Sequence, residues 1–446
     1  MNRLSSPIES IQNYYPVLVV GSGYGGAIAA SRLARAGQKV CLLERGREIL
    51  PGEYPETAAE VACETQVDAP QGFVGRRTGL YDFHLDSDLS VLRGCGLGGT
   101  SLINASVSLR PEARVFKNAG WPTEIRQGAP NSLEPYFRRA EEMLKPVPYP
   151  EHLPVPAKLE ALKKAAAGAG GVFFRAPINV TFSSGVNHVG VEQSCCTLCG
   201  DCVTGCNYGA KNTLLMNYLP DAKNHGAEIF TEVSVTYLER SGGRWIIHCE
   251  LLNSGRELFG APTLAITADV VILGAGSLGS TGILLRSKAR GLPLSERLGC
   301  NFTANADVQA FAYNTEDVVN GIGAGAQPVQ DVGPVGPCIT GVIDGRYADS
   351  LADSVVIEEG AVPGALSMPL PEALAAAATG NGTKRGLLQT LKATEREIKS
   401  LVLGPYRGAT RNTLTSLVMG HDDGQGRLVL ENGRLCIRWP GLAQQP

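Results

Sequence analysis

The sequence predicts an α/β fold in which a Rossmann-like, nucleotide-binding domain is combined with a second, α+β substrate-binding domain. Two apolar stretches, at residues 15–20 and 39–44, flank an amphipathic stretch at residues 24–36. This strand–helix–strand order is typical of a parallel sheet with covering helices. A glycine-rich turn joins the first strand to the helix. Beyond about residue 306 this alternation gives way to many Gly and Pro turns, which indicates a change of domain.

Length and composition agree with this organisation. A chain of 446 residues exceeds what one hydrophobic core usually supports, so we expect two or three domains. Apolar residues make up 43% and charged residues 19%, as in ordinary globular proteins. The net charge is -3 and no run of Lys or Arg stands out, so we expect no nucleic-acid partner. The 54 glycines suit a backbone that approaches a large ligand closely.

The amino terminus lacks the basic and then apolar pattern of a signal peptide, and no apolar stretch reaches about 18 residues. We therefore expect no membrane span and a cytoplasmic protein. In a long chain without such a signal, twelve cysteines favour metal, cluster or buried thiols over disulfides.

Periodicity predicts the remaining elements in order. Helices are expected at 132–144, 157–167, 213–225 and 387–403, and strands at 228–231, 245–252 and 268–274. A turn is expected at Asn253-Ser254-Gly255, and residues 373–378 form an alanine-rich segment. A hairpin is expected at 427–439 around Asn432-Gly433. Residues 72–110 read as loop-rich. We divide the chain into a first part of the nucleotide-binding domain (1–150), a substrate-side insertion (151–194), a cysteine-rich loop with the second part of that domain (195–305), and a substrate-binding domain (306–446).

The turn after the first strand carries a dinucleotide-binding pattern. Gly21, Ser22, Gly23, Tyr24, Gly25 and Gly26 form G-x-G-x-x-G between a strand and a helix. The first glycine makes the tight turn, the second lets the backbone approach a pyrophosphate, and the third allows close helix packing. Glu44 ends the next strand, where its carboxylate would bind ribose hydroxyls and repel a 2′-phosphate. A glycine-rich turn without a ligand is the simpler alternative.

NAD and FAD both use this arrangement, and a second glycine cluster distinguishes them. Residues 93–105 read Arg-Gly-Cys-Gly-Leu-Gly-Gly-Thr-Ser-Leu-Ile-Asn-Ala. A second set of close backbone approaches suits a cofactor with a long tail and a flat ring, which favours FAD. An NAD-dependent dehydrogenase remains the alternative.

These motifs together resemble a known family. Residues 21–46 and 96–104 resemble the glucose–methanol–choline (GMC) flavin oxidoreductases, and most closely their cholesterol-oxidase-like, long-chain-alcohol-oxidising branch. The resemblance extends through residues 107–116, 199–213, 271–279 and 298–302.

The resemblance implies non-covalent FAD and oxidation of a CH–OH group in an apolar alcohol, either a sterol or a long-chain alcohol. Hydride would pass to flavin N5, and the electrons would pass on to O2 or to an electron-transfer acceptor. It also implies site residues. The ADP half would contact the first glycine turn, Glu44, Arg45, Val233, Gly274 and Ala275, and the pyrophosphate and flavin ring would contact Gly98, Gly99, Thr100, Ser101, Asn104 and Ala105.

The family's catalytic histidine lies in a C-terminal segment that we expect this chain to lack. None of its six histidines is followed by Pro or lies in a matching motif. We therefore assign no catalytic base. This leaves open a truncated, non-catalytic flavin-binding or electron-transfer subunit.

A separate motif suggests a metal centre. Cys196, Cys199, Cys202 and Cys206 have the C-x2-C-x2-C-x3-C spacing of an iron–sulfur run. Structural zinc, or free or disulfide-linked thiols, are the alternatives. An iron–sulfur cluster would favour a dehydrogenase over an oxidase that reduces O2.

Overall fold

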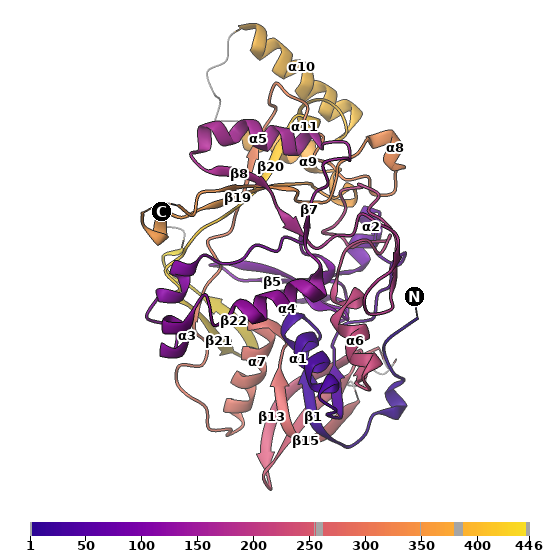
Figure 1. The fold of residues 1–446 in the computed structure, drawn as a ribbon, viewed down its shortest axis with the longest axis vertical. Coiled ribbons are helices and arrows are strands. Elements are labelled where there is room, and N and C mark those ends of the chain that lie inside the picture. The colour runs from indigo at the N-terminus through magenta and orange to yellow at the C-terminus, as the bar shows by residue number, and fades with distance from the viewer. Residues whose placement is uncertain (1, 254, 256–261, 348, 379–386, 443–446) are drawn as a thin grey trace.

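The fold has two sheets at opposite ends of an elongated molecule (Figure 1). The computed structural model describes residues 2–253, 255, 262–347, 349–378 and 387–442. A six-stranded sheet occupies one end, and a five-stranded sheet lies towards the other end beneath several helices. Parallel strands, antiparallel strands and helices are all present, so the predicted α/β class is confirmed.

The six-stranded sheet contains the predicted strand–helix–strand unit. Its order is β12 (Glu228–Phe230), β2 (Val40–Leu43), β1 (Tyr14–Val20), β15 (Thr263–Leu273), β14 (Arg244–Leu251) and β13 (Val233–Ser241). β1 pairs in parallel with β2 on one side and with β15 on the other. Helix α1 (Tyr24–Arg35) connects β1 to β2. The crevice at the carboxyl end of such a central strand is where open α/β sheets bind ligands.

The sequence missed strand β13 and its turn. β13 and β14 form an antiparallel hairpin across Gly242 and Gly243, both with positive φ. Two consecutive positive φ angles are what a two-residue hairpin turn requires, and glycine adopts them without strain. The predicted turn at 253–255 falls partly on Ser254, which lies outside the described residues.

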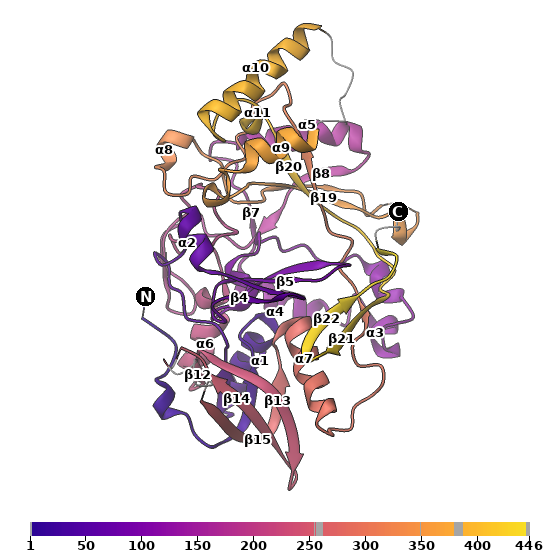
Figure 2. The ribbon, with the colours of Figure 1, turned by 180° about the vertical axis from the view of Figure 1, so that it is seen from behind.

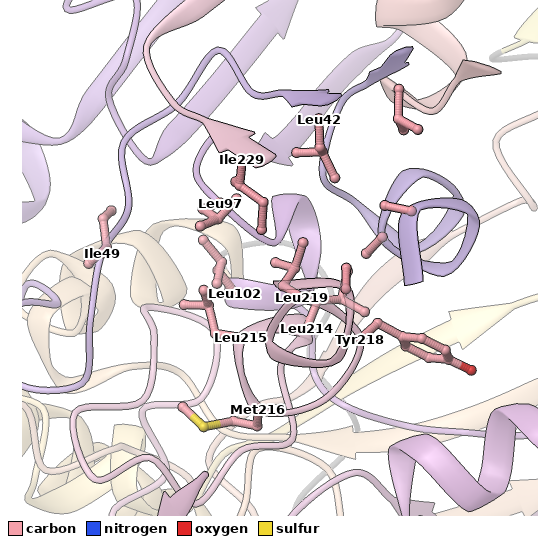
Figure 3. Close-up of a cluster of buried hydrophobic side chains, with 14 of the residues drawn as sticks. Leu42, Ile49, Leu97, Leu102, Leu214, Leu215, Met216, Tyr218, Leu219 and Ile229 are labelled. Atoms are coloured by element: carbon pink, nitrogen blue, oxygen red, sulfur yellow. The ribbon is translucent and has the colours of Figure 1, made fainter. Parts of the chain in front are cut away.

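Buried apolar side chains join this sheet to the second glycine cluster. Figure 3 shows Leu97 and Leu102 pointing towards leucines of the segment 214–219, with Leu42 and Ile229 of the sheet close by. All of these side chains are buried. Burial of each leucine contributes about 1.5–3 kcal/mol, so this packing holds the glycine cluster against the six-stranded sheet.

The five-stranded sheet is antiparallel throughout and combines distant segments. Its order is β17 (Val308–Ala312), β20 (Leu414–Met419), β19 (Val356–Gly360), β18 (Gly341–Asp344) and β8 (Val172–Arg175). Helix α5 (Ala157–Ala169) packs on β18 and β19. From the helix, Lys158 forms a fully buried ion pair with Glu359 of β19, at 2.9 Å. The insertion that precedes the cysteine loop therefore supplies both an edge strand and a covering helix to this sheet.

Three short strands lie in the region that the sequence suggested was loop-rich. A four-stranded sheet has the order β4 (Gly72–Gly75), β3 (Thr65–Ala69), β5 (Tyr81–Leu85) and β6 (Ser90–Gly94). Charged residues in these strands interrupt the alternation of apolar and polar residues by which strands are recognised in a sequence. Arg93 of β6 donates to Asp82 of β5 at 2.7 Å, and His84 contacts Asp68 and Asp86 at 3.0 Å each.

The predicted hairpin near the end of the chain is confirmed. Strands β21 (Gly426–Glu431) and β22 (Arg434–Arg438) turn at Asn432 and Gly433, both with positive φ, and β21 also pairs with β16 (Cys300–Phe302). Figure 2 shows this hairpin beside helix α7 (Gly276–Ala289). The hairpin thus returns to the end of the molecule that contains the six-stranded sheet.

The other elements are short or peripheral. The remaining helices are α2 (Ala58–Cys63), α3 (Thr123–Gly128), α4 (Glu134–Leu144), α6 (Tyr218–Asn224), α8 (Val329–Val332), α9 (Leu370–Ala378), α10 (Leu387–Leu403) and α11 (Gly408–Arg411). Two pairs of two-residue strands are β7 (Val147–Pro148) with β9 (Pro177–Ile178), and β10 (Gly185–Val186) with β11 (Glu192–Gln193). Among the described residues, no helix is long and apolar enough to cross a membrane.

Candidate functional site

A cavity of about 1690 Å³ opens at the carboxyl end of β1. It exceeds the roughly 300–1,000 Å³ of ordinary small-molecule pockets, so it can hold an extended ligand. Of the residues predicted to contact the cofactor, those that line it are Gly21, Ser22, Gly23, Tyr24, Gly25, Glu44, Arg45, Gly99, Thr100, Val233 and Ala275. Gly26, Gly98, Ser101, Asn104, Ala105 and Gly274 do not line it.

Two glycines of the first turn are required by close backbone packing. A Cβ atom on Gly26 would lie 1.8 Å from the carbonyl oxygen of Gly21. A Cβ atom on Gly21, which has a φ of +89°, would lie 2.7 Å from the carbonyl oxygen of Gly274. Helix α1 can therefore approach the ends of β1 and β15 only because these positions have no side chain.

The other two glycines of the turn face open space. A Cβ atom on Gly25 would meet no protein atom within 4 Å, and one on Gly23 would meet only the carbonyl oxygen of Gly274, at 3.9 Å. Gly23 is the N-cap of α1, and the first N–H groups of a helix have no acceptor within the helix. Gly23 and Gly25 therefore form a cradle that a Cβ would fill, at the positive end of a helix dipole, and this fits a diphosphate.

The Glu44 carboxylate connects the two glycine segments. Its Oε2 accepts hydrogen bonds from the Ser22 backbone N–H at 3.0 Å and from Ser22 Oγ at 2.6 Å, while its Oε1 accepts from the Gly46 N–H at 2.8 Å. Ser22 Oγ in turn accepts from the Gly98 N–H at 2.9 Å. A carboxylate has about four acceptor positions, so these three bonds leave capacity for one more donor, such as a ribose hydroxyl.

Two residues that do not line the cavity, Ser101 and Asn104, hold the second glycine cluster in place. Ser101 Oγ donates to the Gly98 carbonyl at 2.7 Å and accepts from the Leu214 N–H at 3.1 Å. Asn104 donates its side-chain amide to the Tyr24 hydroxyl at 3.0 Å. In this structure Ser101 and Asn104 therefore position the cavity wall. Arg45, on the lining, forms an ion pair with Asp82.

The four cysteines of the C-x2-C-x2-C-x3-C motif come together. They line one small cavity of about 20 Å³ together with Lys211. None of the twelve cysteines forms a disulfide. Burial raises the pKa of Cys196 and of Cys199 to about 12. Within the described ranges, no group of three or more His, Cys, Asp or Glu side chains is placed to hold a single metal ion.

A carboxyl group that the sequence did not single out is buried in the five-stranded sheet. Glu358 of β19 is 2% exposed, and its Oε1 has no hydrogen-bond partner among the described residues. Burial, with the charges of Glu359 and Asp307, raises the pKa of this carboxyl to about 7. The signal in the sequence was the pair Glu358-Glu359 inside an apolar strand, because alternation must turn one of the two carboxylates to each face.

The two glutamates do point to opposite faces. Glu359 meets Lys158 of helix α5, so Glu358 lies on the face away from that helix. Val342, which is directly opposite Glu358 in the sheet, packs in a cluster with Val107 and Ala210. Val107 follows the second glycine cluster in sequence. Asp307, whose charge acts on Glu358, lines the large cavity. Glu358 therefore faces the part of the molecule that contains the glycine cluster.

Comparison with known proteins gives consistent matches. The family model described as GMC oxidoreductase matches residues 17–306. A cholesterol oxidase from Mycobacterium tuberculosis is 29% identical over 454 residues, which cover 95% of this chain and 72% of that protein. A long-chain-alcohol oxidase from Arabidopsis thaliana is 27% identical, over 70% of this chain and 38% of that protein.

Solved structures show the same fold at low sequence identity. Pyridoxine 4-oxidase from Mesorbium loti has a TM-score of 0.56 at 15% identity, over 97% of this chain and 77% of that one. A fungal aryl-alcohol oxidase has a TM-score of 0.53 at 14% identity, over 97% of this chain and 80% of that one.

Proposed function

The chain belongs to the GMC oxidoreductase family, and we propose that it oxidises the CH–OH group of an apolar alcohol with FAD bound in the large cavity. The observation that carries this proposal is the cradle at Gly23 and Gly25, which opens into that cavity at the start of α1. Backbone N–H groups there would hold the diphosphate, and Glu44 would bind the adjoining ribose. When bound, FAD supplies the acceptor for the hydride that leaves the carbinol carbon.

We propose that Glu358 accepts the hydroxyl proton; Asp307, whose charge acts on Glu358, lines the large cavity. A general base works best when its pKa lies near the operating pH, and the pKa of Glu358 is raised to about 7. Its buried Oε1 receives no hydrogen bond from the described residues, which leaves an acceptor position unused. Glu359 offers no such position, because Lys158, Thr340 and Gly341 already donate to its carboxylate.

Apolar surroundings support an apolar alcohol as the substrate. Val342 and Val356 lie on the same sheet face as Glu358 and pack with Val107, Ile178 and other apolar side chains. The relatives named cholesterol oxidase and long-chain-alcohol oxidase act on molecules of this kind. We therefore propose a sterol or a long-chain alcohol as substrate, with O2 or an electron-transfer protein as the final electron acceptor.

Anaerobic mixing tests the function directly. The FAD-loaded protein is mixed in detergent with cholesterol or with a long-chain primary alcohol, and the flavin absorbance is followed. We expect one of these alcohols to reduce the flavin and so to abolish its visible absorbance. A flavin that stays oxidised with both would identify a non-catalytic flavin-binding subunit, and a colourless protein that binds NAD would identify an NAD-dependent dehydrogenase. Admitting O2 or a dye to the reduced protein then distinguishes an oxidase from a dehydrogenase.

Glu44→Gln is expected to weaken FAD binding by about 10–100-fold. The amide can accept at one position only, so a backbone N–H of Ser22 or Gly46 loses a charged acceptor, at a cost of about 1.5–3 kcal/mol. Titration of the apoprotein with FAD, followed by flavin fluorescence, measures the change. Glu9→Gln, at an exposed position, is the control. Equal affinity of the Glu44 variant and the wild type would show that this carboxylate does not organise the FAD site.

A further inference from the structure

The cysteine loop does not fit the iron–sulfur centre that its spacing suggested. Among the described residues, no group of three or more His, Cys, Asp or Glu side chains could hold a metal ion. The cavity lined by Cys196, Cys199, Cys202 and Cys206 is about 20 Å³, which is too small for a cluster. Of the described residues that line this cavity, Lys211 is the one with a charged side chain. The loop therefore encloses part of a lysine.

The ammonium group of Lys211 is buried and is held by backbone carbonyls. Lys211 is 2% exposed, and its Nζ donates to the carbonyl oxygens of Leu102, Asn104 and Cys202, at 3.1, 2.6 and 3.0 Å. These bonds use all three N–H donors of the ammonium. Within the described part of the chain it forms no ion pair, and a buried charge without a counter-charge is costly. Its charge therefore requires an explanation other than stability.

Lys211 is joined to the lining of the large cavity through a single residue. Two of its acceptors, the carbonyls of Leu102 and Asn104, belong to the second glycine cluster, whose Thr100 lines that cavity. Asn104 also donates its side-chain amide to the Tyr24 hydroxyl at 3.0 Å, and Tyr24 lines the same cavity. Lys211 itself does not line the cavity. It can therefore act on a ligand there through its charge and through the position of Asn104, without touching the ligand.

The ionisable groups that face this ammonium are thiols. The charges that act on it are those of Cys202, Cys206 and Cys338, and burial raises the pKa of Cys202 and of Cys338. Burial lowers the pKa of Lys211 to about 8. The ammonium therefore keeps its charge at pH 7 and loses it as the pH rises through about 8. The other titratable groups in the small cavity, whose pKa burial also raises, are Cys196, Cys199 and Tyr208.

We propose, on the basis of the FAD site proposed above, that Lys211 raises the reduction potential of the flavin bound in the large cavity. Reduction adds negative charge to the flavin, so a positive charge held nearby favours the reduced form. Charges of the protein tune the electronics of a cofactor in this way. Lys211 is thus a positioning residue, which also holds the carbonyls of Leu102 and Asn104 in one place.

The midpoint potential of the bound flavin, measured against pH, tests this role on the wild type. The reduced flavin holds the Lys211 proton more tightly than the oxidised flavin does. Just above pH 8 reduction should therefore take up one additional proton, and the potential should fall more steeply with pH than it does below 8. Redox titration of the FAD-loaded full chain with a reference dye gives the curve. A slope that does not steepen above pH 8 would overturn the proposal, whereas a chain that retains no flavin would contradict the FAD site itself.

Lys211→Met removes the charge while keeping a long side chain. At pH 7 we expect the equilibrium constant for flavin reduction to fall about tenfold, the effect of a unit charge across roughly 10 Å of protein. This corresponds to about 30 mV for two electrons, and the steeper region above pH 8 should vanish. Lys163→Met, at an exposed position of α5, is the control. Equal potentials in the Lys211→Met variant and the wild type would overturn the proposal.

Lys211→Arg gives a second variant that separates charge from packing. A guanidinium stays charged at every pH of the titration. We therefore expect the wild-type potential at pH 7 without the steeper region above pH 8. A steeper region that persists in Lys211→Arg would assign the additional proton to another group. The wild-type curve decides the question even if Lys211→Met fails to fold.

Discussion

Glu358→Gln is expected to lower kcat for alcohol oxidation by about 10²–10⁴-fold while FAD remains bound, because a general base contributes a factor of that size. The amide has the shape of the protonated carboxyl and cannot accept a proton. In the wild type, kcat/KM should rise as the pH increases through about 7, because only the ionised carboxylate acts as a base. In the variant this rise should disappear.

Stability measurements test the raised pKa of Glu358 independently of catalysis. In the unfolded chain Glu358 ionises near the ordinary glutamate pKa, whereas in the folded chain its pKa is raised to about 7. In the folded state this carboxyl therefore stays protonated up to a higher pH than in the unfolded state. The free energy of unfolding falls as the pH rises from the ordinary glutamate pKa through about 7. Glu358→Gln removes this loss, so above pH 7 urea should unfold the variant at a higher concentration than the wild type.

Glu359→Gln is the matched comparison on the other face of the same strand. Removal of this charge leaves Lys158 buried without its partner, which should cost about 3–5 kcal/mol of stability. The pH dependence of kcat/KM should remain. If Glu359→Gln abolished the rise near pH 7 and Glu358→Gln preserved it, the proton acceptor would have been assigned to the wrong residue.

Gly26→Ala is expected to give a protein that retains almost no flavin. The new methyl group would lie 1.8 Å from the Gly21 carbonyl oxygen, so α1 must move away from β1. Overpacking of this kind costs about 1–3 kcal/mol, and the displacement would also disturb the helix N-terminus that lines the cavity. Flavin content per chain and urea unfolding measure the two consequences separately.

Gly25→Ala gives the informative contrast within the same helix. Its methyl group would meet no protein atom within 4 Å, so the apoprotein should be at least as stable as the wild type. Gly25 nevertheless lines the cavity, and a methyl group there would occupy space needed by the diphosphate. We expect weak FAD binding with unchanged stability. Tight FAD binding by Gly25→Ala would exclude the cradle as the diphosphate site.

Local patterns predicted the parts of the fold that local interactions determine. The strand–glycine turn–helix at residues 14–35 and the hairpin at Asn432-Gly433 depend on neighbours in sequence, and both were anticipated. The pairing of β8 with β18 could not be predicted, because it joins residues far apart in the chain. The strands within residues 72–110 were hidden because tertiary ion pairs compensate their charged side chains.

The residues of the candidate site also divide into those that local sequence indicated and those whose role depends on long-range contacts. Residue type indicated the glycines of the first turn, because backbone approach requires that amino acid. The sequence could not show that Ser101 and Asn104 support the cavity wall instead of lining it, because this depends on bonds to Leu214 and Tyr24. Glu358 was missed because its pKa reflects burial by neighbours from several strands.

The wide separation of β8 from its sheet partner has a consequence during synthesis on the ribosome. β8 ends at Arg175, and β18, its neighbour, begins at Gly341. At about 5–20 residues per second, translation of the intervening chain takes roughly ten to thirty seconds. During that time Phe173 and Phe174 belong to a nascent strand that has no partner strand. Unpaired strands with exposed apolar side chains are prone to aggregate. Production of this protein should therefore depend on chaperones that bind exposed aromatic segments.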